Sequence, residues 1–338
     1  MRRVQLSVLI GLLSILWCAG AVMALTKDDV RKLGYLRCGV STGLPGFSVP
    51  DEDGNWSGMD VDICRAVAVA VLGDTTKVKF IPLAEDEQFT ALQAGDVDLL
   101  SRNSSWTFTN DTSLALNFAG IAYYDGQGFL VARKLKIKKS LDLSGASLCV
   151  VPGSAQELNA GRFFTRNKME YKPVFFNSFS EAVKGFKEDK CSVLSHKKSI
   201  LYGVQSHLQA DRKAFVLPEV IAREPLSPVV RQGDDSWFNI VKWTLYLLIN
   251  AEEEGVSSTN VERLKAKASS DESGTGVLSV KGTGLGLADD WAIQVIRQVG
   301  NYQEIFERNL GEKSSLKIQR GLNALWSRGG LLYAPPFH

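Results

Sequence analysis

Three short polar stretches that each follow an apolar run hold the side chains of this sequence best suited to bind a small molecule. They are SRNSSWTFTND, PGSAQ and SHKKS. These stretches offer hydroxyl, amide, imidazole, cationic and backbone N–H groups from the following residues: Ser101, Arg102, Asn103, Ser105, Asn110, Gly153, Ser154, His196 and Lys197. In open α/β sheets, ligands bind outside the carboxyl ends of strands. We therefore predict a cleft for a polar solute, with SRNSSWT on one side and PGSAQ with SHKKS on the other.

Several of these residues also have a purely structural interpretation. Lys197 and Lys198 fit a solvated loop as well as a pocket. His196 could orient a ligand group or respond to pH, but a single histidine more often simply lies at the rim. Arg102 fits a solvated or structural arginine, because the alkyl stem can cover apolar surface while the charge stays in water. The sequence leaves these alternatives open.

The same residues do not form a catalytic or metal-binding set. The sequence has no GxSxG nucleophile motif and no series of Ser, His and acid on the predicted cleft strands. Asp60, Asp96 and Asp98 are interpreted as helix-entry and turn residues. There is no CxxC, and the histidines show no ligand spacing: His196, His207 and His338. No strand leads into the Gly-rich KGTGLG, which argues against a phosphate loop. We expect no enzyme activity, no metal and no cofactor.

The N-terminal residues have the three-part pattern of a secretory signal peptide. Two arginines precede an uncharged apolar stretch that ends in small residues, so we predict that residues 1–24 are removed after Ala24. A membrane anchor is the alternative, but the apolar run is short and lacks a stop-transfer flank. Cys18 follows Trp17 rather than a small residue, which argues against lipidation. The pattern predicts export to the periplasm.

Charge and length exclude some functions and favour a two-lobed architecture. Removing residues 1–24 takes two of the 39 basic residues and leaves 37 against 37 acidic ones, a formal net charge of 0. This balance favours neither nucleic acid nor an anionic membrane as a partner. The remaining 314 residues (338 minus 24) are too many for one comfortable core, so we expect two lobes.

Four cysteines remain after export, an even number that suits disulfides in an oxidising compartment. Four cysteines allow three connectivities. We favour Cys38 with Cys64 and Cys149 with Cys191, because each pair then closes a local loop within one half of the sequence.

Strands and helices alternate along the chain in a pattern that occurs twice. A strand through Cys38 precedes a helix that Ser57 or Asp60 caps and Gly73 ends; the strand VKFIPL, a helix ended by Gly95 and a further strand follow. ASLCVVPGSAQELNAGRFF, YKPVFF and SFSEAVKGFKEDKCSVLSHKK repeat this order. The alternation predicts two α/β lobes, each with a helix-flanked mixed sheet.

Two extended stretches, YYDGQGFLVARKLKIKKS and FVLPEVIAREPLSPVVRQGDDSW, follow the two copies of this pattern. They predict a two-stranded hinge. We place residues 25–130 and 222–338 in lobe 1 and residues 131–221 in lobe 2. The later WFNIVKWTLYLLIN is apolar nearly all round, which predicts a buried helix.

Many stretches, in the same order, resemble the solute-binding proteins of polar and general L-amino acid ABC importers. They include CGVSTGLPGFS, SGMDVDICRAVA, FTALQAGDVDLLSRNSSWT, YYDGQGFLV, LPEVIAREPLSPVVRQGDDSWF and QVGNYQEIFERNLG, and with the others they span nearly all of the predicted mature chain. The resemblance implies a two-lobed type II periplasmic binding fold. It also implies a monomer that closes around a small polar solute and delivers it to an ABC permease in the inner membrane.

The chain departs from this family at both charged groups that hold an amino acid. In the family an Arg after the SRNxxWT-like stretch grips the ligand carboxylate, with help from backbone groups and a hydroxyl, and an Asp on the other lobe receives the ammonium. In this sequence the position that resembles the family Arg is Asn110, and the position that resembles the family Asp is Lys197. Arg102 could compensate for the missing clamp. Phe47 in GLPGF resembles the aromatic shelf beside the ligand, with an apolar residue at the lobe edge as the alternative.

The leading functional hypothesis is therefore a solute-binding component of an amino-acid-type importer that is divergent at its ligand site. Its ligand is an amino acid or an organic anion. The alternative is a chain that keeps the fold but no longer binds amino acids and serves as a sensor or scaffold.

Overall fold

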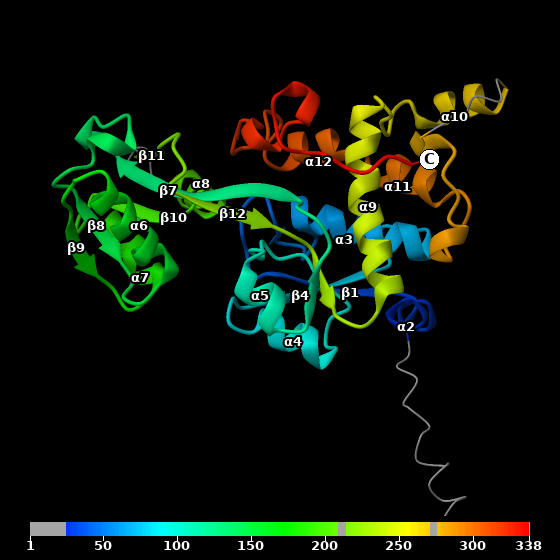
Figure 1. Cartoon of the computed structure of the whole chain (residues 1–338), viewed down its shortest axis with the longest axis horizontal. Helices are drawn as coiled ribbons and strands as arrows, with labels where there is room; N and C mark the ends of the chain where they lie inside the picture. Colours follow the sequence, from blue (N-terminus) through cyan, green and yellow to red (C-terminus); the bar gives the residue numbers. More distant parts are fainter. Residues whose placement is uncertain (1–24, 209–213, 271–275, 338) are drawn as a thin grey trace, which may run out of the picture.

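The chain folds into two lobes of unequal size that are joined by extended strands (Figure 1). The structure, a computed structural model, describes residues 25–208, 214–270 and 276–337. The predicted signal peptide, residues 1–24, lies outside the described residues.

Lobe 1 is built on a five-stranded mixed sheet with the order β4-β1-β5-β13-β6. β1 pairs in parallel with β4 and β5, whereas β13 pairs antiparallel with β5 and β6. Its strands are β1 Leu36–Ser41, β4 Val78–Leu83, β5 Leu99–Leu100, β6 Leu116–Phe118 and β13 Val229–Arg231. A two-stranded ribbon also belongs to this part of the chain, formed by β2 Val49–Pro50 and β3 Trp56–Ser57.

The helices of lobe 1 include an N-terminal set and a C-terminal set that pack together. The elements are α2 Thr26–Leu33, α3 Met59–Leu72, α4 Gln88–Ala94, α5 Phe108–Ser113, α9 Asp235–Glu253, α10 Val261–Ser270, α11 Trp291–Val299 and α12 Tyr302–Asn309. α9, α11 and α12 contact α3, so the last third of the sequence completes the core of the first. α9 is largely buried, as predicted, and no helix among the described residues is long and apolar enough to cross a membrane.

The predicted ends of two helices are confirmed, but one predicted start is wrong. Gly73 and Gly95 end α3 and α4 in the left-handed conformation, which glycine adopts without steric cost. α3, however, has Gly58 as its N-cap, with a φ of 132°, rather than Ser57 or Asp60. A Cβ at Gly58 would overlap the main-chain carbonyl of Phe47, so this close approach decides the start of the helix.

Lobe 2 contains a mixed sheet with the order β11-β7-β10-β8-β9, and β12 also pairs with β7. The strands are β7 Tyr123–Ala132, β8 Ser147–Val150, β9 Lys172–Phe175, β10 Val193–Lys197, β11 Ala214–Val216 and β12 Ala222–Leu226. The helices of this lobe are α6 Ala155–Arg166, α7 Phe179–Lys187 and α8 Lys198–Ser206. The predicted repeat of strand, turn and helix is present here.

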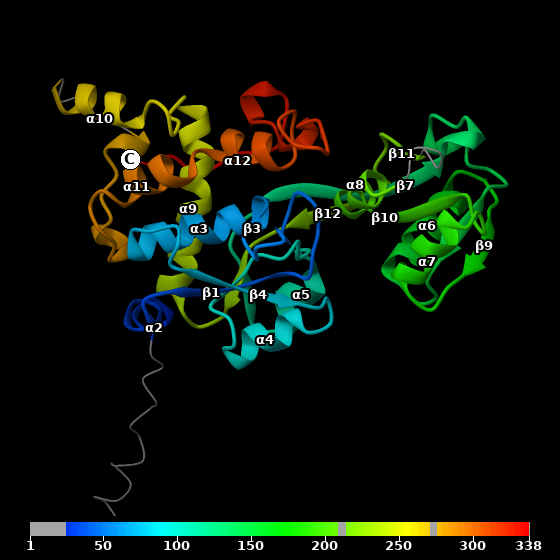
Figure 2. The same cartoon turned by 180° about the vertical axis from the view of Figure 1, so that it is seen from behind.

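Two antiparallel strands, β7 and β12, connect the lobes (Figures 1 and 2). β7 begins in the core of lobe 1 with Tyr123 and continues into the core of lobe 2 with Phe129 and Val131. The two-stranded hinge is therefore present. The exact boundaries at residues 131 and 221 stay a prediction, because both strands extend through the junction.

Each lobe carries one disulfide with the predicted partners. Cys38 in β1 is bonded to Cys64 in α3, and Cys149 in β8 is bonded to Cys191 before β10. The two disulfides tie a strand to its neighbouring elements within a lobe, and neither crosses the hinge.

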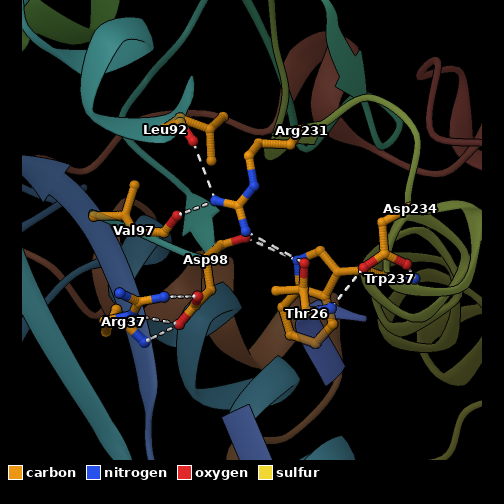
Figure 3. Close-up of polar contacts among 8 residues, drawn as sticks. All are labelled: Thr26, Arg37, Leu92, Val97, Asp98, Arg231, Asp234 and Trp237. Atoms are coloured by element: carbon orange, nitrogen blue, oxygen red, sulfur yellow. Dashed lines mark hydrogen bonds and ion pairs between the residues drawn. The ribbon is translucent and has the colours of Figure 1, made fainter. Parts of the chain in front are cut away.

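A buried polar network holds the start of β5, the strand that leads into SRNSSWT (Figure 3). The carboxylate of Asp98 accepts hydrogen bonds from Arg37 Nη2 at 2.5 Å and from Arg37 Nε at 3.1 Å. The main-chain carbonyl of Asp98 accepts Trp237 Nε1–H at 2.8 Å. Arg231 donates to the main-chain carbonyls of Leu92 and Val97, on either side of the turn after α4. Asp98 is thus a fixed ion-pair partner rather than the simple turn residue that the sequence predicts.

The C-terminal segment, residues 313–337, adds a contact to the hinge that the sequence does not predict. Asn323 accepts the N–H of Tyr124 in β7 at 2.7 Å and donates to its carbonyl at 3.1 Å. The Tyr124 hydroxyl donates to the carbonyl of Leu331 at 3.0 Å. Asn323 is buried, and its side-chain amide pairs with the main chain of β7 as a neighbouring strand would. β7 therefore has a hydrogen-bonding partner on both edges, β12 on one and Asn323 on the other.

Replacing Asn323 with alanine is expected to lower the free energy of unfolding by about 1–3 kcal/mol, since it leaves the N–H and carbonyl of Tyr124 without their partner. Urea unfolding measures the loss, and exchange of the Tyr124 amide should accelerate. Gln319→Ala removes an exposed amide from the same segment and is the control. Equal stability of the two variants would contradict the role of Asn323.

Candidate functional site

A cavity of about 190 Å³ lies between the lobes, beside the carboxyl ends of β8 and β10. One lining residue, Glu85, comes from lobe 1. The others come from lobe 2: Leu148, Cys149, Val150, Val151, Ser154, Gln156, Glu157, Ala160, Phe179, Ala182, Ser195 and His196. The cavity is where the sequence places one side of the cleft, and it combines an apolar floor with hydroxyl, imidazole and carboxylate groups.

His196 presents a neutral N–H to this cavity. Its Nδ1 accepts the main-chain N–H of Lys197 at 2.9 Å, which leaves the proton of the neutral ring on Nε2. The ring packs against Phe179 with 4.2 Å between the centroids. Burial, with the nearby charge of Lys197, lowers the pKa of His196 to about 3. His196 is therefore a hydrogen-bond donor that stays uncharged at neutral pH.

The lowered pKa of His196 leads to a prediction for the stability of the protein in acid. The unfolded chain binds a proton on this residue below its ordinary pKa of 6.5, whereas the folded protein does so only near 3. As the pH falls below 6.5, this residue should therefore cost the folded state about 1.4 kcal/mol per pH unit. In His196→Asn the loss of stability between pH 6.5 and 5 should be smaller by about 1.6 kcal/mol in total, as measured by urea unfolding at each pH.

Two buried carboxylates also change the stability of the protein over this pH range. Burial raises the pKa of Asp60 to about 7 and that of Asp125 to about 6, so their contributions to stability fall as the pH rises from about 4 toward 7. They act in the opposite direction to His196, and the difference between wild type and variant isolates the histidine. His207→Asn, at an exposed ring, is the control. An unchanged slope in His196→Asn would contradict the prediction.

Gly153 and Ser154 form the turn at the start of α6. Ser154 lines the cavity and caps the helix by accepting the N–H of Glu157 at 3.1 Å. Glu157 in turn accepts the N–H of Gly153 at 2.7 Å. Ser154 is therefore at the cavity, whereas the amide of Gly153 is already engaged within the turn.

Ser101, Arg102 and Asn103, which follow β5, already have hydrogen-bond partners within the protein. The Ser101 hydroxyl donates to Asp60 at 3.2 Å, and Asn103 donates to the hydroxyl of Ser199 in lobe 2 at 3.4 Å. Arg102 donates through Nε to the carbonyl of Leu83, and burial lowers its pKa. The structure thus engages Arg102 in lobe 1, and its use as a carboxylate clamp stays a hypothesis.

Three other predicted residues lie away from the cavity. Ser105 donates to Glu224 of β12 at 2.5 Å, and Asn110 donates to the carbonyl of Ser105 at 3.0 Å, so both residues serve the hinge side of lobe 1. Phe47 is 1 % exposed and packs edge-on against Tyr123 in the core. This placement favours the apolar alternative for Phe47, and its role as an aromatic shelf stays a hypothesis.

Lys197 is buried rather than part of a solvated loop. Its Nζ donates to the carbonyl of Asn103 at 3.0 Å, from the end of β10 to the loop after β5. Lys198, in contrast, bonds to the carbonyl of Pro218 within lobe 2. Lys197 therefore joins the two sides of the predicted cleft at its base.

Sequence reasoning missed the carboxylates around this base and at the cavity. Asp60 and Asp125 are buried beside Lys197, and Glu85 and Glu157 line the cavity. Asp125 belongs to the hinge stretch YYDGQGFLV, where a charged residue within an otherwise apolar strand was the available signal. No group of three or more His, Cys, Asp or Glu in the part of the chain that the structure describes could hold a metal ion.

Two mixed-sheet lobes, a two-stranded hinge and a polar cavity between them define a two-lobed solute-binding protein of the type II periplasmic class. Residues 36–312 match the model of the bacterial extracellular solute-binding proteins, family 3, and the chain belongs to this family.

Named relatives cover nearly the whole chain. The chain is 49% identical over 339 residues to the general L-amino acid-binding periplasmic protein AapJ of Rhizobium johnstonii, covering 99% of each sequence. It is 44% identical over 321 residues to the glutamate/glutamine/aspartate/asparagine-binding protein BztA of Rhodobacter capsulatus, covering 94% of this chain and 95% of that protein.

A solved structure is similar as well. It is an ABC transporter periplasmic binding protein from Brucella ovis with glutathione bound, with 50% sequence identity and a TM-score of 0.85. The match covers 93% of this chain and 99% of the other. The predicted fold and the predicted class of protein are confirmed.

Proposed function

We propose that this protein captures a polar, amino-acid-derived solute between its lobes and delivers it to an ABC permease in the inner membrane. The observation that carries the proposal is the cavity at the lobe junction, which His196 and Ser154 of lobe 2 line together with Glu85 of lobe 1. Such a site joins the two lobes through the solute, so that binding favours the closed arrangement.

The named ligands of the relatives support a solute of this class. One relative is named for acidic amino acids and their amides, and the Brucella ovis protein holds glutathione, a tripeptide. The cavity combines neutral donors with carboxylates, which suits a solute that carries both acceptor oxygens and an amine.

Export and assembly follow the same proposal. A signal peptide, residues 1–24, directs the chain to the periplasm and is cleaved there, and the mature protein acts as a monomer. Its partners are the solute and the permease, without nucleic acid, and it catalyses no reaction.

A thermal-shift screen of the protein purified from the periplasm tests the proposal, with L-amino acids, glutathione and small organic acids as solutes. A solute at about 100 times its dissociation constant should add about 2.7 kcal/mol of stability. Stabilisation by any of these solutes supports solute capture. If none stabilises the protein at millimolar concentration, the chain keeps the fold without this function.

A further inference from the structure

Lys197 places an ammonium group at the base of the cleft, between the two lobes. Its side chain is attached at the end of β10 and reaches the carbonyl of Asn103 after β5, at 3.0 Å. The residue is 7 % exposed. An ammonium carries three N–H donors. Among the described residues this is the one hydrogen bond that the Lys197 side chain makes, so further donors remain for an acceptor in the cleft.

Two buried carboxylates lie within the electrostatic reach of this ammonium. Asp60, the second residue of α3, accepts from Ser101 through one oxygen, while its other oxygen has no hydrogen-bond partner among the described residues. Asp125 of the hinge strand accepts the N–H groups of Gly126 and Ser199. The positive charge of Lys197 favours the ionised form of both. The ammonium of Lys197 is thus a positive charge that the protein itself provides beside these carboxylates.

Resting on the proposed function, we infer that Lys197 determines which solutes the cleft accepts. It acts as an internal ammonium group, so the solute turns a carboxylate or carbonyl oxygen toward it and carries no ammonium on the neighbouring carbon. A second ammonium beside Lys197 would be a like-charge contact in a site from which water is largely excluded, and such contacts are strongly unfavourable.

The cavity lined by His196 and Ser154 shows where a solute's own amine fits. His196, the neighbour of Lys197 in the chain, lines this cavity and offers a neutral Nε2–H to an acceptor oxygen of the solute. Carboxylates line the cavity elsewhere: Glu85 from lobe 1 and Glu157 from α6. One oxygen of Glu157 accepts the N–H of Gly153, and Glu85 is near the charge of Arg102. The accepted class is therefore amine-free carboxylic acids, together with peptides and ω-amino acids whose ammonium lies far from the bound carboxylate.

Three four-carbon acids test this inference by calorimetry. L-2-Aminobutanoate carries its ammonium beside the carboxylate, 4-aminobutanoate carries it at the other end, and 2-oxobutanoate replaces it with a carbonyl. The natural protein should bind the last two at least about 100-fold more tightly than the first. Lys197→Asp should reverse this order. Lys197→Met, which removes the charge with little change in length, should bring the three affinities close together.

Lys198→Met is the matched control, because this neighbouring lysine bonds within lobe 2 to Pro218 and should leave the wild-type order intact. If the natural protein binds L-2-aminobutanoate as tightly as either of the other acids, the inference is overturned while solute capture stands. If it binds none of the three and Lys197→Asp binds L-2-aminobutanoate, Lys197 does exclude the ammonium. If neither chain binds any of them, the inference is overturned, and the broader thermal-shift screen decides separately on solute capture.

Discussion

The double variant Asn110→Arg with Lys197→Asp is expected to bind L-α-amino acids at least about 1,000-fold more tightly than the natural chain. The aspartate removes a like charge and offers an anion to the ligand ammonium beside the carbonyl of Asn103. Asn110 lies outside the cavity, on the hinge side of lobe 1, but the longer arginine extends from there and offers the ligand carboxylate a planar fork whose donors match both oxygens. The two changes act on different ligand groups, so their effects should nearly add.

The single variants and a lysine substitution separate these contributions. Asn110→Lys supplies a point charge without the fork and should give a smaller gain than Asn110→Arg. Glu224, which accepts from Ser105 at 2.5 Å, could capture the new guanidinium, so Glu224→Gln in the same background is a further control. Calorimetry with L-alanine and L-glutamate measures the affinities. A double variant no tighter than the natural chain would show that these positions do not hold the ligand.

Asp98→Ala is expected to lower the free energy of unfolding by about 3 kcal/mol, near the lower end of what removing one partner of a buried ion pair costs. The Asp98 side chain is fully buried and receives two guanidinium bonds and the main-chain N–H of Arg37 (Figure 3). The guanidinium of Arg37 is partly exposed, so water replaces some of the loss. Urea unfolding measures the change.

Asp96→Ala is the control for this variant, because Asp96 is exposed and lies two residues away on the same turn. Its effect should stay within about 0.5 kcal/mol, as for most surface substitutions. If both variants lose the same stability, the turn conformation rather than the ion pair is responsible, and the role of Asp98 is refuted.

Sequence patterns predicted the features of this fold that depend on neighbouring residues. The alternation of strands and helices, the glycines that end α3 and α4, and the buried character of α9 all follow from local periodicity and backbone freedom. The two disulfides were also predicted, because of the three possible connectivities this one closes a local loop within each half of the sequence.

Features that depend on distant residues could not be predicted in this way. Asn323 meets Tyr124 across 199 positions, and Asp98 meets Trp237 across 139. Phe47 is aromatic in a loop, and only the packing of Tyr123 against it shows that it belongs to the core. In the candidate site, the sequence pattern placed His196 and Ser154 on the cleft, and both line the cavity. The burial of Lys197 beside Asp60 and Asp125 could not be predicted in this way, because it depends on three separate parts of the chain.

The connectivity of the two disulfides has a consequence for biogenesis. An exported chain emerges from its N-terminus, so its cysteines reach the oxidising compartment in the order Cys38, Cys64, Cys149 and Cys191. Each native partner is the next cysteine to emerge. An oxidase that joins thiols as they arrive would therefore form both native pairs directly. Secretion of this protein should need a disulfide oxidase but no isomerase to rearrange mispaired cysteines.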